Sequence, residues 1–297
     1  MGYTSRVREP LLEYRIDLAG YGTRVLELEG SGPPVLLIHG FSDSADTWRL
    51  TLERLAREGR RALAVDLPGF AEADPLPADG RVLEHYDAFA AAAVERLADE
   101  GERVIVAGNS LGGCVALRVG ARGDLPVAGI VPVAPAGLDM PRWFSIIERD
   151  LLVRGILGSP VPPPGPVVRR TVGVVYRQLA FARPRAASED VVRAFTGHLR
   201  DARSVSRFLD VGRRMLPELT LDAFDFDAID VPVLLVWGDR DRMVSHSGAR
   251  HILDAVPQAR YVELPGCGHC PQLEEHDAFA DLLLGFEPER VRAKGVA

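Results

Sequence analysis

The chain has 297 residues, of which 47% are hydrophobic and 26% charged, a composition typical of a globular protein with a substantial core. Its formal net charge of −7 argues against nucleic acid as the main partner. No apolar run is long enough to span a membrane, and the first ten residues lack the apolar segment of a secretory signal. We therefore expect a cytoplasmic protein, monomeric or homodimeric, that acts on a small molecule and binds neither nucleic acid nor membrane.

The first half of the chain alternates short apolar runs with segments of helical periodicity. The first two runs predict strands that form an antiparallel edge, joined by a turn at residues 20–22. The later runs are rich in β-branched residues and predict buried strands of a parallel sheet. The expected strands cover residues 14–18, 24–29, 35–38, 62–65, 104–107 and 127–134, and the expected helices cover residues 46–58, 82–99 and 111–119.

The pattern changes after residue 136 and resumes near residue 231. Between residues 138 and 221 the sequence shows helix-like segments separated by proline-rich stretches and no clear buried strand. About 80 residues of this kind would bury little apolar surface alone, which argues against a second independent domain. We predict a core of residues 1–137 and 222–297 with residues 138–221 inserted into it. The later expected elements are strands at 231–237 and 259–264 and helices at 247–256 and 277–286.

A glycine-rich pentapeptide separates the strand at residues 104–107 from the helix that follows it. It reads Gly108-Asn109-Ser110-Leu111-Gly112, the Gly-x-Ser-x-Gly spacing of a nucleophile elbow. Such a turn lifts the serine hydroxyl clear of the backbone, where a base can take its proton, and the helix N-terminus favours nearby negative charge. Ser110 is therefore the candidate nucleophile. The alternative is a tight turn with an incidental serine.

An acid and a histidine follow Ser110 in the chain order that this arrangement requires. His269 lies in the loop after the strand at residues 259–264, where it would accept the Ser110 proton. Asp241 lies after the strand at residues 231–237, where it would orient the imidazole. Asp239 and Asp139 remain alternatives for the acid.

These motifs together resemble the capped branch of the α/β-hydrolase superfamily. The resemblance implies an α/β fold with a mostly parallel eight-stranded sheet flanked by helices and a helical cap inserted after the sixth strand. It also implies an oxyanion hole formed by the N–H groups of Phe41 and Leu111. The matching residues are His39-Gly40-Phe41, Asp66-Leu67-Pro68-Gly69-Phe70, Gly108-Asn109-Ser110-Leu111-Gly112-Gly113, Trp237-Gly238-Asp239-Arg240-Asp241 and Gly268-His269.

The serine at the elbow narrows the reaction that the resemblance implies. Haloalkane dehalogenases and epoxide hydrolases of this fold use aspartate there. We therefore expect a serine hydrolase that cleaves a carboxylic ester, or a related acyl bond, through an acyl-enzyme on Ser110, without a cofactor. A carbon–carbon bond hydrolase of ring-cleavage diketones and a weakly catalytic ligand receptor are the alternatives.

Several residues outside these motifs are candidates for substrate binding. Aromatic side chains of the insertion could line an apolar pocket, and a hydroxyl beside the oxyanion loop could bind the substrate. Cys267 and Cys270 flank His269, but they supply too few ligands for zinc, so we expect no metal. Arginines outnumber acidic residues in the insertion, which suggests an anionic substrate or simply surface ion pairs. The substrate-binding candidates are Ser42, Trp143, Phe144, Tyr176 and Phe208.

Overall fold

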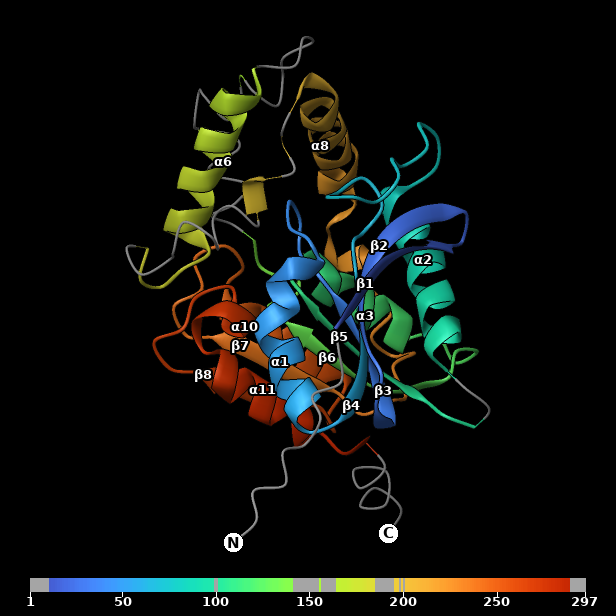
Figure 1. The fold of residues 1–297 in the computed structure, drawn as a ribbon. Coiled ribbons are helices and arrows are strands. Elements are labelled where there is room, and N and C mark those ends of the chain that lie inside the picture. Colours follow the sequence, from blue (N-terminus) through green and yellow to red (C-terminus); the bar gives the residue numbers. More distant parts are fainter. Residues whose placement is uncertain are drawn as a thin grey trace, which may run out of the picture.

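An eight-stranded sheet runs through the centre of the molecule (Figure 1). The computed structural model describes residues 11–98, 101–140, 155, 164–184, 195–197, 199 and 201–288. In spatial order the strands are β1 (Leu12–Leu18), β2 (Tyr21–Leu28), β4 (Arg60–Val65), β3 (Ser31–Ile38), β5 (Val104–Asn109), β6 (Val127–Val133), β7 (Leu234–Gly238) and β8 (Arg260–Leu264).

Strand direction confirms a mostly parallel sheet with an antiparallel edge. β2 pairs antiparallel with both β1 and β4, whereas all pairs from β4 to β8 are parallel. The turn expected at residues 20–22 is wrong, because Tyr21 and Gly22 already belong to β2. Ala19 and Gly20 make the turn instead, with φ of 53° and 83°. Two successive positive φ angles suit a two-residue hairpin, since they match the twist of the strands.

Helices cover both faces of the sheet, as the sequence predicts. α1 (Arg49–Arg57) and α11 (His276–Leu284) contribute apolar side chains to the core on one face. α2 (Val82–Leu97), α3 (Leu111–Gly120) and α9 (Ala249–Ala255) contribute to the core on the other face. The segment before α1 is a short 3-10 helix, and α10 (Pro271–Glu274) precedes α11.

Among the residues described between β6 and β7, two segments form α-helices, which confirms a helical insertion after the sixth strand. They are α6 (Gly165–Leu179) and α8 (Ala202–Met215), and Figure 1 shows both above the sheet. α8 begins with a capping box in which Asp201 accepts from the Ser204 N–H and Ser204 accepts from the Asp201 N–H. Among the described residues, no helix is long and apolar enough to cross a membrane.

A buried ion pair fixes the edge of the sheet to the loop that follows β4. The Arg24 guanidinium on β2 donates to both carboxylate oxygens of Asp66, at 2.9 and 3.2 Å. Asp66 is fully buried and also accepts from the Ala45 N–H at 2.7 Å. Arg24 donates further to Asp46 at 2.9 Å. Several hydrogen bonds therefore compensate for burial of the Asp66 charge.

Replacing Arg24 with methionine should destabilise the fold strongly, because it leaves the Asp66 carboxylate buried without its cation. We expect the free energy of unfolding in urea to fall by about 3–5 kcal/mol. Arg15→Met is the control, because Arg15 pairs with Asp74 at 3.3 Å and both side chains are half exposed. That variant should lose about 1 kcal/mol or less. Equal losses in the two variants would contradict this account of the Arg24 network.

Candidate active site

Ser110 occupies a strained turn between β5 and α3. Its φ of 56° and ψ of −111° lie in a region that costs a non-glycine residue about 1–3 kcal/mol. The flanking glycines make so tight a turn possible. A Cβ on Gly108 would lie 2.1 Å from the Gly112 carbonyl oxygen, and one on Gly112 would lie 2.1 Å from the Ile38 carbonyl oxygen. Any larger residue at either position would force the elbow apart.

The loop after β3, residues 39–44, runs directly beside the elbow. A Cβ on Gly40 would lie 3.3 Å from the Ser110 Cβ. The two predicted oxyanion donors are the N–H groups of Phe41 in this loop and of Leu111 at the first position of α3. Neither N–H donates a hydrogen bond to another described residue. An unpaired N–H at a helix N-terminus can bind an anion, and the helix dipole favours it.

A buried histidine holds this β3 loop in place. His39 Nε2 accepts from the Leu67 N–H at 2.8 Å, and Nδ1 lies 2.7 Å from the Gly40 carbonyl oxygen. Complete burial lowers the pKa of His39, which favours the neutral ring. A neutral ring with its proton on Nδ1 satisfies both contacts, so His39 has a structural role here.

His269 and Asp241 form a buried hydrogen-bonded pair. His269 Nδ1 lies 2.7 Å from Asp241 Oδ2, and both side chains are almost inaccessible to solvent. Asp241 Oδ1 accepts from the N–H groups of Met243 and Val244 at 2.8 and 3.0 Å. The second ring nitrogen, His269 Nε2, is buried and has no hydrogen-bond partner among the described residues.

The other two candidate acids, Asp239 and Asp139, are hydrogen-bonded to groups other than the His269 ring. Asp239 accepts from the Gly266 N–H at 2.7 Å, and Asp139 accepts from the Ser247 hydroxyl at 2.7 Å. Asp139 also faces His251 and Arg250. Of the three acids considered, Asp241 is therefore the one that contacts the His269 ring.

The side chain of Asn109 joins the elbow to the loop after β8, residues 265–270. Its Nδ2 donates to the His269 carbonyl oxygen at 2.9 Å, and its Oδ1 accepts from Gln272 Nε2 at 3.2 Å. Because Asn109 immediately precedes Ser110, this bond brings the two loops side by side. No hydrogen bond joins Ser110 Oγ to His269 Nε2 in this structure. Such bonds are often long in unliganded enzymes and tighten with substrate bound.

The predicted substrate-binding residues have different surroundings. Phe208 on α8 packs against Phe41 with ring centroids 5.1 Å apart, beside the β3 loop. The Tyr176 hydroxyl donates to the Phe41 carbonyl oxygen, and its ring stacks on Phe195. Ser42 is buried and its hydroxyl donates to the Phe195 carbonyl oxygen at 3.2 Å, so contact with substrate stays a prediction. Trp143 and Phe144 lie outside the described residues.

Asp43 is a buried acid beside the site that the sequence analysis did not identify. Its Oδ1 accepts from the Ser44 N–H at 2.8 Å, while Oδ2 is buried without a partner among the described residues. Burial raises the pKa of Asp43 well above its ordinary value, although the Ser44 N–H opposes this shift. No sequence signal could have revealed it, because an aspartate in a loop is normally solvated.

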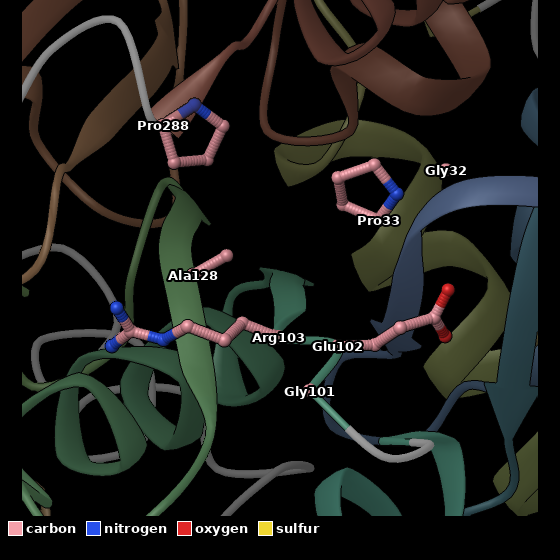
Figure 2. A pocket seen from close by; sticks show the side chains of 7 residues that line it. All are labelled: Gly32, Pro33, Gly101, Glu102, Arg103, Ala128 and Pro288. Carbon is pink, nitrogen blue, oxygen red and sulfur yellow. The ribbon is translucent and has the colours of Figure 1, made fainter.

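A cavity lies away from these residues, at the opposite end of the strands. Its volume is about 460 Å³, and it opens at the amino ends of β3, β5 and β6, between Pro33, Arg103 and Ala128 (Figure 2). Ser110 follows the other, carboxyl end of β5.

Within the described ranges, no three His, Cys, Asp or Glu side chains are grouped as metal ligands. Burial raises the pKa values of the Cys267 and Cys270 thiols, which disfavours the thiolates that zinc would need.

The sequence and the fold are both similar to those of known hydrolases. A family model of the alpha/beta hydrolase family matches residues 35–282. Lipase 1 of Psychrobacter immobilis is 26% identical over 266 residues, which cover 86% of this chain and 77% of that protein. A 2-hydroxy-6-oxo-6-(2'-aminophenyl)hexa-2,4-dienoic acid hydrolase of Metapseudomonas resinovorans is 27% identical over 288 residues, 94% of this chain and 92% of that protein. The crystal structure of a membrane phospholipase A superposes with a TM-score of 0.71 at 25% identity, covering 95% of this chain and 87% of that one.

Asp43→Asn should change how stability depends on pH. A carboxyl whose pKa is raised in the folded state stabilises the fold below its unfolded pKa, and this contribution is lost as pH rises through the folded pKa. Asparagine stays neutral and can still accept from the Ser44 N–H. As pH rises, the wild type should therefore lose free energy of unfolding that the variant keeps, so the difference between them should shift in favour of the variant. Urea unfolding at a series of pH values measures this difference. Parallel pH profiles for the two proteins would contradict a raised pKa.

Proposed function

The chain belongs to the alpha/beta hydrolase family, and from that premise we propose that it is a serine hydrolase of carboxylic esters, acting through an acyl-enzyme on Ser110. The observation that carries the proposal is the buried hydrogen bond between His269 Nδ1 and Asp241 Oδ2, because it leaves Nε2 free to serve as a base. The strained turn at Ser110 and the similarity to lipases support the same chemistry. The reaction needs no cofactor or metal ion.

The first half of the proposed reaction forms the acyl-enzyme. Ser110 Oγ attacks the ester carbonyl carbon while His269 Nε2 takes the hydroxyl proton. Asp241 fixes the ring with Nδ1 protonated and stabilises the imidazolium that forms. The N–H groups of Phe41 and Leu111 stabilise the developing oxyanion, which gives them a role only once charge appears. The imidazolium then protonates the departing alcohol.

The second half returns the enzyme to its starting state. His269 takes a proton from water, which attacks the acyl carbon and passes through a second oxyanion. Collapse of this intermediate breaks the bond to Ser110 Oγ, and the proton on Nε2 returns to the serine. The carboxylic acid product then leaves. Apart from water, the proton and charge balance requires only the groups already named, which are the Ser110 hydroxyl, the His269 ring, the Asp241 carboxylate and the two oxyanion N–H groups.

The inserted residues 138–221 are proposed to cap this site above the core of residues 1–137 and 222–297. α6 and α8 place Tyr176 and Phe208 against Phe41, which supports a partly apolar substrate next to the oxyanion donors. Selection of an anionic substrate by the arginines of the insertion, and a cytoplasmic location, stay predictions.

Ser110→Ala should abolish acyl transfer and leave the fold intact. With p-nitrophenyl butyrate we expect the wild type to release a burst of product equal to the enzyme concentration, or to turn over steadily where deacylation is fast. The variant should lose on the order of 10⁴-fold or more in kcat. A fluorophosphonate should label the wild type at Ser110, read by mass spectrometry, and leave the variant unlabelled.

Ser247→Ala is the matched control, because Ser247 has a hydroxyl bonded to Asp139 and Ser245 rather than to this site. It should keep both activity and labelling. Turnover without labelling of Ser110, or labelling at another serine, would contradict the mechanism. Absence of both from the wild type would favour the ligand receptor.

Carbon–carbon bond hydrolysis is a second candidate, favoured by the nearly full-length similarity to the Metapseudomonas resinovorans hydrolase. A direct comparison of kcat/KM for p-nitrophenyl butyrate and a 2-hydroxy-6-oxo-6-phenylhexa-2,4-dienoate separates the two functions. We expect the ester to be preferred about tenfold or more, because Phe41-Ser42-Asp43 follows His39-Gly40 here. Carbon–carbon bond hydrolases that the chain resembles usually carry a longer glycine-rich segment at this place. A preference for the dienoate would overturn the ester assignment and keep Ser110 as the reactive group.

A further inference from the structure

The carboxyl-terminal end of α6 contacts three of the loops that carry the site. The Tyr176 hydroxyl donates to the Phe41 carbonyl oxygen in the β3 loop. Arg242, next to Asp241 in the loop after β7, donates to the Gln178 carbonyl oxygen at 3.2 Å. The His269 N–H donates to the Ala180 carbonyl oxygen at 2.7 Å. Residues 176–182, called the α6 anchor below, are thus bonded to the loops of Phe41, Asp241 and His269.

One carboxylate completes the contact between the α6 anchor and the histidine loop. Glu274, the last residue of α10, accepts from the Gly268 N–H through Oε1 at 2.9 Å. Its Oε2 accepts from the Ala182 N–H at 2.8 Å. Only a carboxylate offers two acceptor oxygens in this arrangement, and hydrogen bonds to an ionised group are the stronger kind. Glu274 therefore bridges the residue before His269 and the end of the α6 anchor.

Close backbone packing leaves this bridge little freedom. A Cβ on Gly268 would lie 2.6 Å from both the Ala180 carbonyl oxygen and the Ala182 nitrogen. The His269 main chain is consequently held at its N–H by Ala180 and at its carbonyl oxygen by Asn109. The ring itself has one bonded partner among the described residues, Asp241. The direction in which the free Nε2 points thus depends on the hydrogen bonds that hold the backbone on either side of His269.

We propose that Glu274 is a positioning residue that sets the direction of His269 Nε2 by tying Gly268 to Ala182 of the α6 anchor. The inference rests on the proposed function of His269 as a base and deepens it. Glu274 touches neither substrate nor the reacting atoms in this mechanism. Its effect comes through the backbone of the histidine loop, because a misplacement of about 1 Å in a catalytic group can cost a hundredfold in rate.

The matched pair Glu274→Gln and Glu275→Gln tests this role. Each change removes one negative charge at adjacent positions, but Glu275 accepts none of the side-chain hydrogen bonds described in this loop. In Glu274→Gln the side-chain amide keeps one acceptor oxygen but places an NH₂ group against the second backbone N–H, so one of the two hydrogen bonds is lost. With p-nitrophenyl butyrate we expect Glu274→Gln to lower kcat between tenfold and a hundredfold with KM changed less than about twofold. Glu275→Gln should match the wild type in both constants.

Hydrogen exchange gives a readout that does not depend on ester hydrolysis. The amides of Gly268 and Ala182 should exchange faster in Glu274→Gln than in the wild type and in Glu275→Gln. Glu274→Asp retains the charge on a shorter side chain that reaches one N–H at most, so it should lose kcat to a smaller extent. It also serves as the test variant if the glutamine variant does not fold.

The outcomes separate this inference from the proposed function. Unchanged kcat in a folded Glu274 variant, or equal losses in kcat and substrate affinity together with a lower melting temperature, would overturn the positioning role. A wild type that neither hydrolyses the ester nor reacts with a fluorophosphonate would instead overturn the function, while faster exchange at Gly268 and Ala182 would still report the tie made by Glu274.

Discussion

The strained backbone of Ser110 is the constraint on which the rest of the site depends. A φ of 56° persists in a serine only where surrounding contacts over-determine it. Those contacts come from the end of β6 and the residues just after it, because the Ser110 N–H donates to the Val133 carbonyl oxygen and the Ser110 carbonyl oxygen accepts from the Ala136 N–H. Contact of Gly112 with β3 adds a second constraint. The turn is thus held by the two strands that flank β5, and it positions the hydroxyl where the carboxyl ends of the parallel strands meet.

The features that the sequence could predict are those coded by neighbouring residues. β5 and α3 follow from a β-branched run and from helical spacing, and the glycines at 108 and 112 report a close approach that no side chain permits. The order of Ser110, an acid and His269 follows from the alternation of strands and helices. Such local signals predicted the sheet, the helices on both faces and the helical insertion. The errors lie at element ends, such as the turn at Ala19 and Gly20, and in short helices, such as α10, which was not predicted.

Local signals could not decide most contacts between distant segments. The sequence favoured Asp241 as the partner of His269 but left Asp239 and Asp139 open, because only the path of the loop after β7 turns Asp239 toward Gly266 and Asp241 toward His269. Burial of Asp43 depends on neighbouring residues brought by the fold, and nothing in its local sequence distinguishes it from a solvated loop residue. Nothing in the local sequence distinguishes Glu274 from an ordinary surface acid near a helix. In the structure its carboxylate accepts from the N–H of Ala182, which lies 92 residues earlier in the chain.

A parallel sheet fixes where each strand ends but not how the loops beyond those ends face one another. The loops of Phe41, Asp241 and His269 follow β3, β7 and β8, and β3 is separated from β7 by two strands. The α6 anchor bonds to all three loops from outside the sheet, so one short segment of the insertion relates their positions. Under the proposed mechanism, a helix placed there serves in two ways, because it covers the substrate and also holds the loops beneath it. Sequence changes at the end of α6 would then alter catalysis through the positions of these loops.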